Sequence, residues 1–295
     1  MKNILVPTDF SIAAENAAHY AINFAKAQKS NVVLCNAYRV PSESPVAAQV
    51  AWPLIEEVDL ELESDNSLNE LVRKLEKDKL SVTNNYSPQI TFESAKGGVC
   101  QVVKELVKQK KMDLVVMGMA GAGQLVQWAL GSNSKVMIDK ADFPVLYVPY
   151  VAKYKSIKTI AFSTNLSIDD LEPLQYLCDM AANLEAEIVV YHITSYELEK
   201  VERAEGRSLA YYNGVIKKLA YDKIRFENIW HSDIDEGFRW IRNHEEIDMI
   251  AMVHQQHSLL DKLLNGSYAH KLSRFTAVPL LIFQPREKKY SYDKA

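Results

Sequence analysis

The 295-residue sequence has only three cysteines, and its positive and negative charges nearly balance. The cysteines are odd in number and widely spaced, and Cys35 and Cys178 lie in apolar patterns. These features favour buried, reduced thiols over a disulfide framework. The formal net charge of −4 gives no electrostatic reason to expect nucleic acid or an anionic membrane as a partner. The length is enough for two domains, each with its own core.

Long hydrophobic runs are also missing. The apolar run after Met1 is too short for a signal peptide and stops at Pro7. Residues 114–134 carry no charge, but four glycines, two glutamines, one asparagine and two serines among them argue against a transmembrane helix. We therefore expect a cytoplasmic protein with no membrane partner.

Glycine is scarce as well, but four of the ten glycines fall between positions 118 and 131. The apolar run Leu114–Met117 before them predicts a buried strand, and residues 135–140 behind them predict a helix. Backbone N–H groups in a loop without side chains can approach an anion closely, and a helix N-terminus adds free donors and partial positive charge. The segment therefore predicts a phosphate site, with tight turns alone as the alternative.

The sequence repeats itself with a long period, which indicates duplicated domains. Four segments of the first half return in the second half with the same apolar pattern. They are residues 2–11, 32–37, 113–117 and 143–148, which return as 158–167, 188–193, 248–252 and 278–283. The first two return 156 residues later and the last two 135 residues later, so the second half has lost about 21 residues between its second and third strands.

Strands and helices alternate in each half, which predicts a doubly wound α/β domain with a parallel sheet. Ser11 is the predicted N-cap of the first helix, and Ala14, Ala17, Ala18, Ala21 and Phe24 form its buried stripe. In the first half the predicted strands are 4–6, 32–37, 90–94, 113–117 and 145–148, and the helices are 11–28, 60–80, 99–108 and 135–140. Ligands of such sheets bind outside the carboxyl ends of strands, where the strand order reverses.

The glycines follow the spacing Gly-x2-Gly-x9-Gly-Ser, which is neither the Walker nor the dinucleotide pattern. The opening segment Ile4–Ser11 reads Ile-Leu-Val-Pro-Thr-Asp-Phe-Ser. In both features the chain resembles the universal stress protein family, whose ATP-binding members carry this glycine spacing after the fourth strand. The resemblance implies two adenine nucleotide alpha hydrolase-like domains in tandem: residues 1–150 with an intact nucleotide loop and residues 156–285 with a degenerate one. Residues 286–295 form a polar tail that we expect to be disordered.

The resemblance also assigns roles to residues of the first half. The first turn meets the nucleoside, where Asp9 would accept hydrogen bonds from ribose or adenine, and the backbone of Ala37 meets the adenine edge. Ser132 could equally be only an N-cap, and Asp9 could simply cap the first helix. The full predicted nucleotide site is Pro7, Thr8, Asp9, Ala37, Met117, Gly118, Gly121, Gly131, Ser132, Asn133 and Ser134.

Catalytic groups are sparse around this loop. Family members often carry a polar or basic residue between the first two glycines, where this chain has Met119 and Ala120. Between Leu114 and Ile138, Lys135 is the one cation and there is no carboxylate, whereas phosphoryl transfer needs both charge neutralisation and an oriented nucleophile. We therefore predict no catalytic residue and slow or absent hydrolysis. A divalent metal, Mg or Mn, would be held through the phosphates of the ATP or other adenine nucleotide.

The second half keeps the pattern of the fold but loses the loop. Aligned on the first half, Gly118 becomes Val253 and Asp9 becomes Asn165, so we expect no ATP at the second crevice. His254 and His257 have the spacing of a ligand pair but lack a cysteine or carboxylate partner, so we predict polar loop histidines and no metal site.

Three functions remain open at this point: a nucleotide-binding stress regulator, a slow ATPase on the same site, and an interaction scaffold that binds no nucleotide. The final strands 145–148 and 280–283 are strongly apolar, and such strands invite aggregation when left at an exposed edge. Because related single-domain proteins pair these strands across a two-fold axis, we predict that the halves dock as an intramolecular pseudo-dimer. A further homodimer is compatible with this arrangement.

Overall fold

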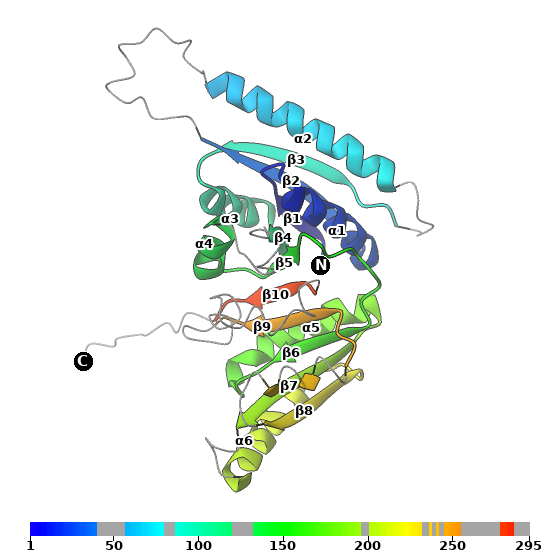
Figure 1. Cartoon of the computed structure of the whole chain (residues 1–295), viewed down its shortest axis with the longest axis vertical. Helices are drawn as coiled ribbons and strands as arrows, with labels where there is room; N and C mark the ends of the chain where they lie inside the picture. Colours follow the sequence, from blue (N-terminus) through cyan, green and yellow to red (C-terminus); the bar gives the residue numbers. More distant parts are fainter. Residues whose placement is uncertain are drawn as a thin grey trace, which may run out of the picture. The chain divides into compact units, whose positions relative to one another are not determined.

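The computed structural model describes residues 1–39, 57–79, 86–119, 132–195, 201–231, 236–237, 240–241, 245–254 and 278–285. The chain divides into two compact units. Among the described residues, the first unit contains 1–156 and 278–281, and the second contains 157–254 and 282–285. Both units are α/β, as the alternating pattern predicts (Figure 1). The docking of the two halves as a pseudo-dimer stays a prediction.

The first unit is built on a parallel sheet with strand order β3-β2-β1-β4-β5. Its strands are β1 (Asn3–Pro7), β2 (Asn31–Tyr38), β3 (Ile90–Lys96), β4 (Leu114–Met119) and β5 (Val145–Pro149). Its helices are α1 (Ile12–Gln28), α2 (Glu57–Lys79), α3 (Val99–Lys110) and α4 (Ser132–Lys140). Helices α1 and α2 pack together, as do α3 and α4, and Figure 1 shows α1 on the opposite side of the strands from α3 and α4. The strand order reverses at β1, between its neighbours β2 and β4.

Helix α1 lies close to the sheet because its buried face is made mostly of alanine. The predicted stripe is confirmed, since Ala17, Ala18, Ala21 and Phe24 have no exposed surface and Ala14 is also buried. The predicted cap is confirmed as well, because the Ser11 hydroxyl accepts a hydrogen bond from the Ala14 N–H at 3.3 Å. The small side chains bring the first turn of α1 against the carboxyl end of β4, where the candidate site lies.

The strands of the second half of the chain repeat this order as β10-β9-β6-β7-β8, in which β9, β6, β7 and β8 are parallel. The His254 N–H donates to the Phe283 carbonyl at 2.7 Å and joins β10 to β9. Its strands are β6 (Thr159–Ser163), β7 (Glu187–Ser195), β8 (Ile224–His231), β9 (Met249–Val253) and β10 (Leu280–Phe283). Its helices are α5 (Leu171–Leu184) and α6 (Val201–Gly214), with short 3₁₀ turns η2 (Ile168–Asp170) and η3 (Ile216–Lys218).

The duplication extends to single hydrogen bonds. The Asp113 carboxylate accepts from the backbone N–H groups of Lys2 and Asn3, and Asp248 makes the same two bonds with residues 158 and 159. The Thr8 hydroxyl accepts from the Phe10 N–H at 3.0 Å, and its counterpart, residue 164, accepts from residue 166 at 2.8 Å. These matched contacts agree with both predicted offsets and show that the two sheets begin in the same way.

Among the helices that the structure describes, none combines the length and the hydropathy needed to cross a bilayer.

Candidate functional site

A cavity of about 170 Å³ opens at the carboxyl ends of β1, β2 and β4 in the first unit. Nine of the eleven predicted site residues line it, while Gly121 and Gly131 lie outside the described residues. The nine are Pro7, Thr8, Asp9, Ala37, Met117, Gly118, Ser132, Asn133 and Ser134. Segments that are far apart in the sequence thus meet at the point where the strand order reverses.

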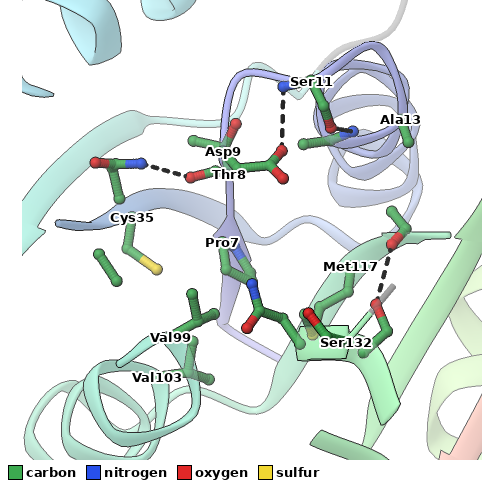
Figure 2. Close-up of a pocket in the computed structure, with 16 residues that line it drawn as sticks. Pro7, Thr8, Asp9, Ser11, Ala13, Cys35, Val99, Val103, Met117 and Ser132 are labelled. Atoms are coloured by element: carbon green, nitrogen blue, oxygen red, sulfur yellow. Dashed lines mark hydrogen bonds between the residues drawn. The ribbon is translucent and has the colours of Figure 1, made fainter. Parts of the chain in front are cut away.

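The turn after β1 fixes the position of Asp9. The Thr8 N–H donates to the Cys35 carbonyl at 2.8 Å. The Asp9 carboxylate accepts from the Ser11 N–H at 3.1 Å (Figure 2). Phe10 holds the turn with a φ of 59°, in the left-handed region that a non-glycine residue enters at some cost. Because Ser11 caps α1, Asp9 is not the helix cap, and its exposed carboxylate lies at the cavity.

The opposite wall is formed by the end of β4 and the start of α4. A Cβ atom on Gly118 would lie 2.4 Å from the Ala13 carbonyl oxygen, so only glycine fits between β4 and α1. Helix α4 begins at Ser132, three residues before its predicted start, and the buried Ser134 hydroxyl donates to the Gly118 carbonyl at 3.4 Å. The first turn of α4 therefore faces the cavity, and the backbone donors of a helix N-terminus favour an anion there.

The remaining wall is apolar, and most of its residues are absent from the predicted site. Val99 and Val103 come from the first turns of α3, and Cys35 comes from β2. Burial raises the pKa of the Cys35 thiol to about 12, so this cysteine is an inert part of the wall. The signal for the valines was available, since α3 starts after Gly97 and Gly98 at the same edge of the sheet and places both valines on one face.

The electrostatics of the site are simple. Among the described residues that line the cavity, Asp9 is the only charged one. In Figure 2, Asp9 lies toward the top of the view and Ser132 toward the bottom, with Pro7 and Met117 between them. The cavity thus offers one carboxylate acceptor, apolar walls and a helix N-terminus, a combination that suits a ligand with hydroxyl groups, an apolar ring and an anionic end.

The profile of the Universal stress protein family matches residues 1–149 of the sequence. The chain belongs to this family. It is 31% identical over 147 residues to Universal stress protein MJ0531 of Methanocaldococcus jannaschii, which covers 50% of this chain and 81% of that protein. It is 24% identical over 302 residues to Universal stress protein Slr1230 of Synechocystis, which covers 96% of this chain and 100% of that protein.

Solved structures show the same fold over nearly the whole chain. The crystal structure of a universal stress protein from Archaeoglobus fulgidus has a TM-score of 0.66 at 15% identity and covers 96% of this chain and 98% of that chain. The crystal structure of a putative universal stress protein from Pseudomonas aeruginosa has a TM-score of 0.55 at 13% identity. The match covers 97% of this chain and 94% of that chain. The chain is therefore a tandem universal stress protein with two α/β domains.

The second α/β domain carries larger side chains at two positions that match the site of the first domain. Val253 stands where the first domain has Gly118. The helical segment after β6 begins with the 3₁₀ turn η2, whereas α1 is α-helical from Ile12. Asp170, which replaces Ala14, is 2% exposed, and its carboxylate accepts from the hydroxyls of Thr164 and Tyr211. Burial raises the pKa of Asp170 to about 6.

The histidines of the second domain do not form a metal centre within the described part of the chain, where no group of three or more His, Cys, Asp and Glu side chains could hold an ion. His192 is buried, with its Nδ1 atom 3.0 Å from the Thr164 carbonyl oxygen. His254 follows β9, and His257 lies outside the described residues.

Proposed function

We propose that the first domain binds an adenine nucleotide, ATP foremost, and that the protein acts as a nucleotide-dependent regulator in a stress response. The observation that carries this proposal is the cavity itself. It places the Asp9 carboxylate and the first turn of α4 around one space, with apolar walls beside them. The carboxylate suits the ribose hydroxyls, the apolar wall suits the adenine, and the helix N-terminus suits phosphate.

Binding with slow or no turnover fits this lining better than efficient catalysis. Phosphoryl transfer requires positive charge near the transferred group and a residue that orients the attacking water. The described lining residues include no lysine, arginine or histidine, and Asp9 is their one carboxylate. We propose that Mg or Mn enters with the nucleotide, held through its phosphates, and neutralises their charge.

Identification of the bound molecule is the direct test. The purified protein should release an adenine nucleotide when it is denatured and the supernatant is examined by mass spectrometry. Incubation with labelled ATP under single-turnover conditions then distinguishes a regulator from an ATPase. A protein that neither co-purifies with an adenine nucleotide nor binds added Mg–ATP would favour the scaffold function instead.

Calorimetric titration with Mg–ATP should give one site per chain. In the second domain Val253 and the buried Asp170 replace Gly118 and Ala14, which both line the cavity of the first domain. Two equivalent sites in the titration would contradict this expectation and would require a different ligand path in the second domain.

The substitution Asp9→Asn should weaken nucleotide binding about tenfold or more. Asparagine keeps an oxygen for the Ser11 N–H. The matching turn of the second domain carries Asn165 and has the same left-handed residue and hydroxyl contact, so the turn can persist. It removes the negative charge, and hydrogen bonds to charged groups contribute about 1.5–3 kcal/mol each. The matched control is Asn165→Ala, which should leave the affinity unchanged. An Asp9→Asn protein with wild-type affinity would show that the carboxylate does not contact the ligand.

A further inference from the structure

Asn36 lies near the end of β2, lines the cavity, and joins the turn after β1 to helix α2. Its Nδ2 atom donates to the Thr8 carbonyl at 2.7 Å, and its Oδ1 atom accepts from the Ser64 hydroxyl of α2 at 2.9 Å. A carbonyl oxygen can only accept, so the amide nitrogen must face Thr8 and the amide oxygen must face Ser64. Both contacts are therefore specific in direction.

The Thr8 carbonyl belongs to the peptide group that leads into Asp9. The other polar atoms of Thr8 are also engaged, with the N–H bonded to Cys35 and the hydroxyl accepting from Phe10. The bond from Asn36 thus fixes the last adjustable part of the turn, and with it the direction in which the Asp9 carboxylate projects. The dashed line that ends beside Thr8 in Figure 2 marks this contact.

The second domain makes the same contact with a different side chain. His192 is the counterpart of Asn36, and its Nδ1 atom lies 3.0 Å from the carbonyl oxygen of Thr164, the counterpart of Thr8. Because that oxygen only accepts, the ring nitrogen must carry the proton. Two chemically different donors at one position indicate that the turn requires a donor to this carbonyl, whichever group supplies it.

We propose that Asn36 is a positioning residue for nucleotide binding, and that Ser64 orients its amide, so that the affinity of the site depends on helix α2. This inference rests on the proposed function of the cavity. Asn36 acts through Thr8 and Asp9 rather than by contact with the ligand. The buried Ser64, which is 5% exposed, makes α2 part of the support of the binding site.

The test compares four variants by calorimetric titration with Mg–ATP. Asn36→Leu removes the donor at similar size and should weaken binding about tenfold, which corresponds to about 1.4 kcal/mol. Asn36→His supplies the donor that the second domain uses and should stay within about threefold of the wild type. Ser64→Ala leaves the amide without its orienting hydroxyl and should weaken binding about threefold. Asn69→Leu is the control, because this exposed amide on α2 donates to the Asp65 carbonyl within its own helix.

Hydrogen exchange of the Phe10 amide provides a readout that needs no nucleotide. Exchange should be faster in Asn36→Leu than in the wild type, and Asn36→His should restore the wild-type rate. Asn36→Leu with wild-type affinity and exchange would overturn the inference, as would Asn36→His behaving like Asn36→Leu. If the wild type binds no adenine nucleotide, the proposed function fails, while the exchange rates still decide whether Asn36 positions the turn.

Discussion

The substitution Gly118→Ala should lower the free energy of unfolding by about 3 kcal/mol and abolish nucleotide binding. The added Cβ would lie 2.4 Å from the Ala13 oxygen, 2.6 Å from the Ala13 carbonyl carbon and 2.9 Å from the Ala14 nitrogen. All three atoms belong to the backbone of α1, so no side chain can rotate away to relieve the contact. Overpacking usually costs about 1–3 kcal/mol, and the displaced helix start also endangers the Ser11 cap, which contributes about 1 kcal/mol.

The measurement is a urea unfolding curve with a Mg–ATP titration of the same preparation. Gly206→Ala is the matched control, because a Cβ at this position of α6 would meet nothing within 4 Å. Alanine favours a helix over glycine by about 1 kcal/mol, so the control should be slightly more stable than the wild type. A Gly118→Ala protein with an unchanged unfolding midpoint would mean that α1 can move away from β4 without cost.

The second domain illustrates how the fold can accommodate a side chain at this position. There Val253 replaces the glycine, and the helix start is rebuilt as the 3₁₀ turn η2 before α5 begins at Leu171. The corresponding turn of the first domain is already α-helical from Ile12. A single substitution at Gly118 lacks this compensating change, so its cost should appear in full.

The sequence predicted the features that depend on local pattern. The strand and helix order of the first half, the alanine stripe of α1, the cap at Ser11 and the family itself follow from periodicity and motif. Element ends were less exact: α2 begins at Glu57 rather than 60, and β3 continues to Lys96 rather than 94. Such ends depend on tertiary contacts, for example the Lys96–Glu57 ion pair between the two elements.

The roles of other residues depend on contacts that no local pattern encodes. Asn36 reads as an ordinary strand residue until the register of β1 and β2 places its amide beside Thr8. In the sequence, Asp170 looks like an ordinary acidic residue at the start of a helix. Its buried role depends on Tyr211 of α6, 41 positions along the chain, which donates a hydrogen bond to it. Gly121 and Gly131 lie outside the described residues, so their roles stay predictions from the motif.

The second domain should lose about 3 kcal/mol of stability as the pH rises from 4 to 7, and Asp170→Asn should remove this loss. Burial raises the pKa of Asp170 from 3.8 to about 6 in the folded protein. Between these values the folded state binds more protons than the unfolded state, so unfolding becomes easier as the pH increases. A difference of about two pKa units corresponds to about 3 kcal/mol, an order-of-magnitude value for a carboxyl that is 2% exposed.

Asparagine is the informative replacement because it keeps the contacts and removes the titration. The hydroxyls of Thr164 and Tyr211 both donate to the same oxygen of Asp170, so a single amide oxygen can accept both. The wild type and Asp170→Asn should therefore be compared by urea unfolding at pH values from 4 to 8. The free energy of unfolding of the variant, relative to that of the wild type, should increase up to about pH 6 and then stay constant. Asp169→Asn removes the exposed neighbouring carboxylate, whose charge raises the pKa of Asp170 less than burial does, so this variant should keep most of the pH dependence of the wild type. If the free energies of unfolding of the wild type and Asp170→Asn differ by the same amount at every pH, the pKa of this carboxyl is not raised in the folded domain.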